Sequence, residues 1–148
     1  MVANLNYEHK NNNPMIKQGD TYAASVKFTQ ADVQKFAEVT GDFNPIHIDA
    51  EYAAKTIFKK PIVHGFLSGA IFSKVFGTLF PGEGTIYLSQ EMKFFAPVFV
   101  EVQYEARFEV MEVNVEKHIG IVNCSLVSSD DTTCIVGAAK LKHDTQFI

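Results

Sequence analysis

The sequence predicts an α+β protein in which a curved antiparallel β-sheet wraps around one long central helix. Residues 65–80 are apolar on nearly every side of a helix and include a single charged residue, Lys74, which is typical of a helix that is buried on most sides. From residue 85 onward, apolar residues recur at every second position instead, which favours a run of antiparallel strands. Because a buried helix must be covered by another layer, and a curved sheet can enclose one, these two observations together give the fold class.

The residues before the central helix predict one strand and two shorter helices. Residues 22–28 are expected to form the strand. Thr29, with Asp32 three positions later, is typical of a helix N-terminus, and Gly41 can adopt the positive φ that ends a helix. Asp49 is then expected to cap a second, short helix.

The later strands are expected over residues 85–95, 98–116, 119–128 and 133–143. In the second of them, even-numbered positions from Val98 to Val110 are apolar, and the apolar positions become odd from Met111 onward. One extra residue near Val110 and Met111 would change the phase in this way, so we predict a β-bulge that bends a long strand.

The composition favours a single globular domain. A chain of 148 residues, with 47% hydrophobic residues and thirteen Phe, is long and apolar enough to form one core. We expect that domain over residues 21–148, after a polar, flexible N-terminal extension of residues 1–20. The net charge of −4 gives no electrostatic reason to bind nucleic acid, and no apolar stretch is long enough to span a membrane.

The cysteine positions and the N-terminus favour a cytoplasmic location. Cys124 and Cys134 lie within predicted strands and form no Cys-x-x-Cys motif, so we expect two buried thiols in a reducing compartment rather than a disulfide. The polar N-terminus lacks the apolar segment of a secretory signal.

The turn after the first predicted helix, GDFNPIH over residues 41–47, contains a carboxylate and an imidazole five residues apart. Pro45 fixes its own φ and biases Asn44 toward an extended conformation, which makes the turn rigid. Asp42 and His47 together are suited to general acid–base catalysis. Taken alone, Asp42 is equally compatible with a turn residue that bonds its own backbone, and His47 with a buried core histidine.

Together with PIVHG at residues 61–65 and PGEGTIYL at residues 81–88, this turn resembles the (R)-specific enoyl-CoA hydratases of the MaoC-like family. The resemblance covers residues 20–143, and Gly-Asp-x-Asn-Pro-x-His is its most specific part. It implies the hot-dog fold, in which a curved antiparallel sheet wraps a long central helix. It also implies reversible addition of water to trans-2-enoyl-CoA to give (R)-3-hydroxyacyl-CoA. No cofactor is expected, and the expected assembly is a homodimer or a higher oligomer.

The resemblance assigns roles to individual residues. Asp42 and His47 match the catalytic pair, and Gly65 matches the residue whose backbone N–H holds the thioester oxygen. The free amides at the start of a helix suit that role on physical grounds as well. Asn44 and Ser73 match positions that support the pair, although a serine in an apolar helix, such as Ser73 or Ser68, also commonly bonds back to the preceding turn.

The expected substrate pocket is lined by Phe43, Phe66 and Phe76. Because Phe76 follows Ser73 by three residues, both share one face of the central helix, and Phe76 is expected to close the far end of the pocket and favour short acyl chains.

His64 is expected to cap or orient the central helix in support of the pair. No metal is expected, because the spacing of Asp42, His47 and His64 matches no zinc signature.

Other functions on the same fold remain open. A dehydratase of 3-hydroxyacyl thioesters on acyl carrier protein, or of branched acyl-CoA, would use the same residues. The Gly-Asp-x-Asn-Pro-x-His motif argues against a hot-dog acyl-CoA thioesterase, and the presence of both Asp42 and His47 argues against a non-catalytic acyl-thioester binding subunit. The sequence does not indicate which member of the pair activates water.

Overall fold

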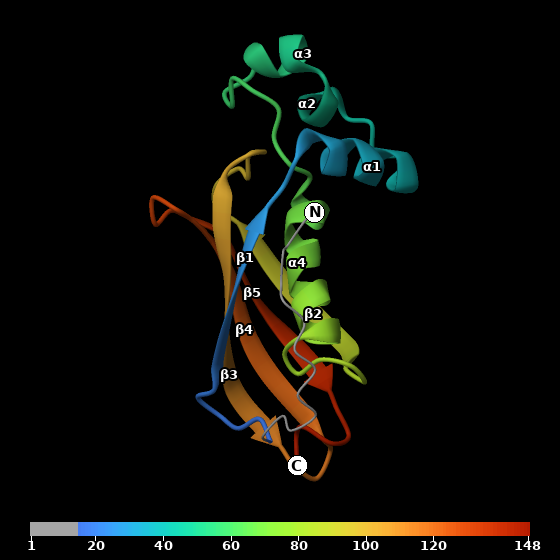
Figure 1. Cartoon of the computed structure of the whole chain (residues 1–148), viewed down its shortest axis with the longest axis vertical. Coiled ribbons are helices and arrows are strands. Elements are labelled where there is room, and N and C mark those ends of the chain that lie inside the picture. The colour runs from blue at the N-terminus through green and yellow to red at the C-terminus, as the bar shows by residue number, and fades with distance from the viewer. Residues whose placement is uncertain (1–14) are drawn as a thin grey trace.

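The computed structural model describes residues 15–148, and all structural statements concern this part of the chain. Its centre is one five-stranded antiparallel sheet, in which the strands lie in the order β1-β3-β4-β5-β2 (Figure 1). The strands are β1 (Thr21–Lys27), β2 (Ile86–Phe94), β3 (Gln103–Asn114), β4 (Ile119–Ser128) and β5 (Thr133–Lys142). Both outer strands, β1 and β2, have one unpaired edge.

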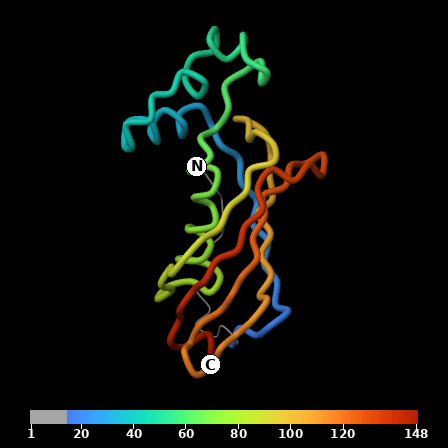
Figure 2. The backbone as a smooth tube through the Cα atoms, turned by 180° about the vertical axis from the view of Figure 1, so that it is seen from behind, coloured from blue at the N-terminus to red at the C-terminus, as the bar shows by residue number. Residues whose placement is uncertain are grey.

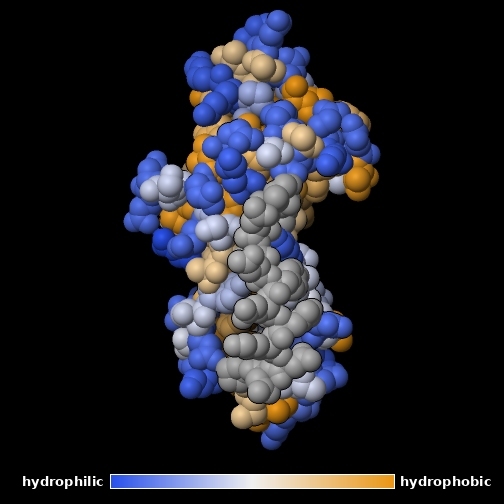
Figure 3. All heavy atoms as spheres, in the orientation of Figure 1, coloured by the Kyte–Doolittle hydropathy of each residue, from blue (hydrophilic) through white to orange (hydrophobic). Residues whose placement is uncertain are grey.

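The longest helix, α4 (Gly65–Thr78), runs along one face of the curved sheet (Figure 1). Figure 2 shows the molecule from behind. Three short helices, α1 (Gln30–Thr40), α2 (Pro45–Ile48) and α3 (Ala50–Ala54), lie together beyond one end of the sheet (Figure 1). On the face shown in Figure 3, hydrophobic patches lie among hydrophilic side chains over this helical end. The predicted α+β class, with a curved antiparallel sheet around a central helix, is confirmed.

Local sequence signals define the ends of the short helices as predicted. The Thr29 hydroxyl accepts a hydrogen bond from the amide of Asp32 at 3.1 Å, and the Asp32 carboxylate accepts one from the amide of Thr29 at 2.9 Å, which completes a capping box. Gly41 ends α1 with a φ of 80°. Asp49 caps α3 by accepting a hydrogen bond from the Tyr52 amide at 3.0 Å.

The core lies between α4 and the sheet. Ile71, Phe72 and Val75 of α4 are each 1% exposed or less. Gly69 allows the close approach of helix and sheet, because a Cβ atom there would lie 2.7 Å from the sulfur of Met92. The helix is buried on most sides, as predicted, except for one narrow side that exposes Phe66 to 75%, and it ends two residues earlier than predicted.

The predicted strand over residues 98–116 begins only at Gln103. Phe99 forms an isolated bridge with Ile62, and Glu101 has a φ of 58°, so residues 98–102 form a turn before the strand. This turn brings the chain toward the helical end of the molecule. The predicted bulge is confirmed, because the register of β3 and β4 shifts between Val110 and Glu112.

The predicted N-terminal extension, residues 1–20, falls largely on residues 1–14, which lie outside the described residues. Of its last part, Ile16 is 5% exposed, and its amide donates a hydrogen bond to the carbonyl of Gln146 at 3.1 Å. Cys124 and Cys134 are free, buried thiols, as predicted. In the described part of the chain, no helix is long and apolar enough to cross a membrane.

Candidate active site

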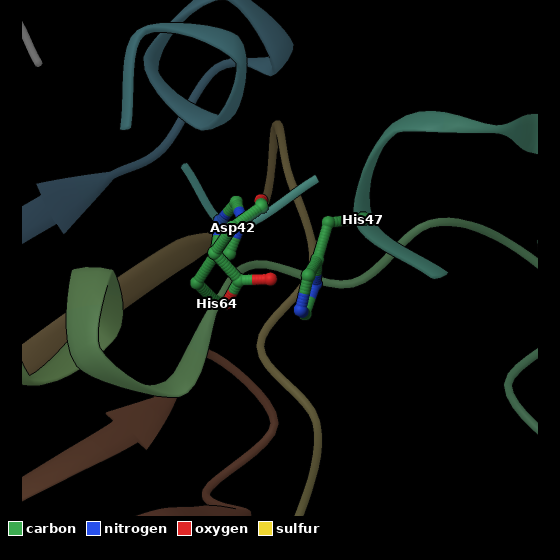
Figure 4. Close-up of side chains that lie close together, drawn as sticks. All are labelled: Asp42, His47 and His64. Carbon is green, nitrogen blue, oxygen red and sulfur yellow. The ribbon is translucent and has the colours of Figure 1, made fainter. Parts of the chain in front are cut away.

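The structure brings the predicted pair together with His64, which lies 22 residues after Asp42. One ligand atom from each of Asp42, His47 and His64 lies within 4.8 Å of the other two. Asp42 comes from the turn between α1 and α2, His47 from α2, and His64 from the residue that precedes α4 (Figure 4). The site therefore lies where the three short helices meet the N-terminus of the central helix.

The turn holds Asp42 by its backbone and leaves its carboxylate exposed. Oδ1 of Asp42 accepts a hydrogen bond from the amide of Asn44 at 3.3 Å, and the carbonyl of Asp42 accepts one from Nε2 of His64 at 3.0 Å. Asn44 in turn caps α2 by accepting a hydrogen bond from the amide of Ile46 at 3.3 Å. One carboxylate oxygen of Asp42 points toward the ring of His47 (Figure 4). The turn interaction considered for Asp42 thus exists and leaves the carboxylate available.

His47 is held in one tautomer by the backbone. Its Nδ1 lies 2.8 Å from the carbonyl oxygen of Ile62. Because a carbonyl can only accept, Nδ1 carries the ring proton, and Nε2 of the neutral ring has a free lone pair. The backbone of His47 is fixed from the other side by Gln30, whose Nε2 donates to the His47 carbonyl at 3.0 Å.

The protonation of His47 is set by opposing causes. Burial lowers the pKa of His47 below its usual 6.5, and the nearby His64 lowers it further, while the carbonyl of Ile62 and the charge of Asp42 act in the opposite direction. His47, which is 9% exposed, is therefore neutral at pH 7 and able to accept a proton.

His64 contacts both members of the pair. It is 2% exposed, and its ring lies against that of His47 with 3.9 Å between centroids and against Phe36 with 4.8 Å. It makes no side-chain cap of α4; its Nε2 donates to the carbonyl of Asp42 instead. Its Nδ1 is buried and has no partner among the described residues. His64 thus fixes the turn that contains Asp42.

Gly65 and His47 line one pocket of about 320 Å³, together with Phe58, Ser68, Phe94, Pro97 and Val98. The Gly65 amide has no acceptor among residues 15–148, whereas the amide and hydroxyl of Ser68 already bond back to the carbonyl of His64 at 2.9 and 3.0 Å. The predicted back-bonding of Ser68 is therefore confirmed. A Cβ atom at Gly65 would lie 3.0 Å from the ring of Phe94, so only glycine leaves this wall undisturbed. A free amide and the positive end of the helix dipole favour a negatively charged oxygen here.

The remaining predicted residues do not line this pocket. Ser73 and Phe66 lie on the exposed side of α4 and line a separate groove of about 300 Å³ between α4 and β2. Phe76 is fully buried and packs edge-on against Tyr87, which forms part of the wall of that groove, with ring centroids 5.5 Å apart. Phe43 is 50% exposed and lines neither concavity.

A third concavity, of about 820 Å³, lies over the strands and contains none of the predicted site residues. Its walls come from β1 to β5 and include no histidine, so it lacks the proton-transfer groups of the smaller pocket.

Sequence reasoning missed two residues that position His47. The carbonyl of Ile62 sets the tautomer, and Gln30 holds the backbone, from positions 15 residues after and 17 residues before His47. Because every residue has a backbone carbonyl, the sequence does not show which one bonds to His47. Only the short separation between the GDFNPIH and PIVHG segments indicated a contact between His47 and Ile62.

Asp42, His47 and His64 are also the group in the described part of the chain that could hold a metal ion. Nδ1 of His47 and Nε2 of His64 are both engaged by backbone carbonyls, so each ring offers only its second nitrogen. In a tetrahedral zinc site, ligand atoms that are about 2.0–2.2 Å from the metal lie about 3.4 Å from one another, whereas the ligand atoms of this group lie within 4.8 Å of one another. Nothing in the arrangement requires a metal, and its predicted absence stays a prediction.

Comparisons with known proteins identify relatives of this chain. The family described as MaoC like domain matches residues 11–130. An (R)-specific enoyl-CoA hydratase from Aeromonas caviae is 36% identical over 127 residues, which are 86% of this chain and 95% of that protein. A 3-hydroxybutyryl-CoA dehydratase from Methylorubrum extorquens is also 36% identical over 127 residues, 86% of this chain and 80% of that protein. A solved structure of the (R)-hydratase from A. caviae has a TM-score of 0.83 and 36% identity, and the match covers 86% of this chain and 97% of that one. The predicted family resemblance and the hot-dog fold are confirmed.

Proposed function

Because the chain belongs to the MaoC-like family of hydratases and dehydratases, we propose that it is an (R)-specific enoyl-CoA hydratase. It adds water reversibly to trans-2-enoyl-CoA and forms (R)-3-hydroxyacyl-CoA. The observation that supports this proposal most directly is the pocket shared by His47 and Gly65, with the carboxylate of Asp42 at its side.

The space between Asp42 and His47 suits the reacting water. The ligand atoms of the two side chains lie within 4.8 Å, and no direct hydrogen bond joins them in the described structure. A water molecule bridges polar groups at such a separation, because it makes a hydrogen bond of about 2.8 Å to each. In the proposed complex, water donates one hydrogen bond to Nε2 of His47 and one to the carboxylate of Asp42.

The tautomer of His47 indicates which member of the pair takes the proton. Nε2 of His47 accepts a proton from water as the water oxygen bonds to C3 of the substrate. The C2–C3 double bond becomes single, and the negative charge moves to the thioester oxygen, where the Gly65 amide stabilises it. The imidazolium then returns a proton to C2 from the same side, and the charge of Asp42 stabilises the imidazolium in between. Dehydration follows the same steps in reverse.

The exposed edge of β2 supports the proposal of a homodimer. Ile86, Leu88 and Phe94 of this strand are 52%, 46% and 52% exposed, and Phe95 and Phe66 beside it are 67% and 75% exposed. An unpaired edge strand with a contiguous apolar surface is suited to pair with a second copy. Sedimentation of the intact protein and of Leu88→Lys tests this assignment: a dimer that the substitution dissociates is expected, and a monomeric intact protein would refute it.

A dehydratase acting on 3-hydroxyacyl thioesters is the second candidate, because one relative is a 3-hydroxybutyryl-CoA dehydratase. The two candidates share one active site and catalyse the same reversible reaction, so they differ in the preferred substrate. Values of kcat/KM for thioesters of different acyl groups, on coenzyme A and on acyl carrier protein, distinguish them.

The test of the proposed function is hydration of a short trans-2-enoyl-CoA, followed by the loss of the conjugated enoyl absorbance. Turnover that Asp42→Asn and His47→Ala both reduce, each by at least about a hundredfold, is expected. Release of free thiol would indicate a thioesterase instead, and binding without turnover would indicate a non-catalytic subunit.

A further inference from the structure

Two adjacent, exposed lysines lie in the chain between two residues that line the pocket containing His47. Phe58 and Ile62 both line this pocket, and Lys59 and Lys60 lie between them in the chain with exposed side chains. The amide of Lys59 donates to the carbonyl of Thr56 at 3.3 Å, and Lys59 has a φ of 66°, so these residues form a defined turn.

Neither lysine is neutralised by a carboxylate. Within residues 15–148, the recorded ion pairs involve Lys27, Arg107 and Lys142, and none involves Lys59 or Lys60. Two adjacent cations without a carboxylate partner place local positive charge beside the pocket, on a protein whose net charge is −4.

An aromatic ring holds one of these cations beside the pocket wall. Nζ of Lys60 lies 4.3 Å from the centroid of the Phe99 ring, a cation–π distance. Phe99 follows Val98, which lines the pocket, and forms an isolated β-bridge with Ile62, another lining residue. The ammonium is therefore held beside the pocket by a contact that leaves its charge available to an anion.

We infer that Lys59 and Lys60 bind the phosphate groups of coenzyme A beside this pocket. The inference rests on the proposed function, since an enoyl thioester whose oxygen meets Gly65 extends its thiol arm out of the pocket. In coenzyme A, that arm ends in several phosphate groups. Lysine can bind phosphate because its ammonium group is a compact charge with three donors. The phosphopantetheine arm of a carrier protein has a single phosphate, so a pair of free cations favours coenzyme A.

The test compares two thioesters of the same acyl group, crotonyl-CoA and crotonyl-N-acetylcysteamine, of which only the first has phosphates. In the double variant Lys59→Gln/Lys60→Gln, KM for crotonyl-CoA is expected to rise about fivefold, as the loss of two exposed charge interactions implies, while kcat stays unchanged. The kinetics on crotonyl-N-acetylcysteamine are expected to stay the same. Lys117→Gln is the matched control, because this exposed lysine lies in the turn between β3 and β4, at the end of the sheet opposite the short helices (Figure 1).

Three results would overturn the inference: an unchanged KM for crotonyl-CoA in the double variant, an equal loss on both thioesters, or a KM change that appears only with crotonyl-acyl carrier protein. Calorimetric titration with free coenzyme A separates this inference from the proposed reaction. Weaker binding of coenzyme A by the double variant supports the lysine site even in a protein without hydratase activity, and equal binding rejects it even in an active hydratase.

Discussion

Replacement of His64 by leucine tests how the site holds its two proton-transfer groups. The substitution removes a ring that is 2% exposed and lies against His47 with 3.9 Å between centroids, together with the hydrogen bond from Nε2 to the carbonyl of Asp42 at 3.0 Å. The hydrogen bond contributes about 1 kcal/mol, and the lost packing of a buried ring adds about 1–2 kcal/mol. We therefore expect the free energy of unfolding to fall by about 2–3 kcal/mol, measured by urea denaturation.

The same variant also changes proton transfer. Burial and, to a smaller extent, His64 lower the pKa of His47, so the neutral base exists above that lowered pKa and is lost as the pH falls through it. In the intact protein, the acid limb of kcat/KM for hydration is expected to have its midpoint below pH 6.5. In His64→Leu the midpoint moves upward, because one of the causes that lower the pKa of His47 is gone, and kcat falls on the order of tenfold as the turn that contains Asp42 loosens.

Phe36→Leu is the control for packing alone. Phe36 contacts the ring of His64, with 4.8 Å between centroids, and its side chain has no donor that could bond to the carbonyl of Asp42 as His64 does. Phe36→Leu is expected to lower the free energy of unfolding without shifting the acid limb of kcat/KM. If His64→Leu lost stability but kept kcat and the pH midpoint of the intact protein, the role of His64 in holding the pair would be refuted.

Three further predictions follow from single contacts. Gly65→Ala places a Cβ atom 3.0 Å from the ring of Phe94. We expect kcat for hydration to fall on the order of tenfold, with a small loss of stability. Steady-state rates equal to those of the intact protein would contradict the role of this wall. Phe76→Ala removes a fully buried ring that packs against Tyr87 and is expected to lower the free energy of unfolding by about 3–5 kcal/mol. Urea denaturation measures this loss, and an unchanged midpoint would contradict the packing role of Phe76. Thr29→Ala breaks the capping box of α1 and is expected to lower the free energy of unfolding by about 1 kcal/mol, as measured by thermal or urea unfolding. An unchanged free energy of unfolding would mean that the cap contributes nothing.

The sequence predicted those features that depend on neighbours along the chain. The capping box at Thr29, the end of α1 at Gly41 and the bulge near Val110 each follow from residues a few positions apart, and all three are present. The association of Asp42 with His47 followed from the rigid turn between them.

The sequence did not predict the features that depend on packing between distant segments. The apolar sequence of α4 does not distinguish the side that packs on the sheet from the side that exposes Phe66 and Ser73. The tautomer of His47 depends on the carbonyl of Ile62, a group that every residue has. Residues 98–102 have the alternating pattern of a strand, but Pro97 and the left-handed backbone of Glu101 turn the chain there.

Hydration of a short trans-2-enoyl-CoA in D₂O tests the central claim most directly. If His47 takes a proton from water and returns one to C2 from the same side of the pocket, the hydroxyl and the deuterium must add to one face of the double bond. The account predicts a product of (R) configuration at C3, with syn addition of deuterium at C2, as determined by NMR and chiral analysis. Anti addition or a mixture of configurations at C2 would contradict proton transfer by a single group at this site, and an (S) product would contradict the proposed (R) specificity.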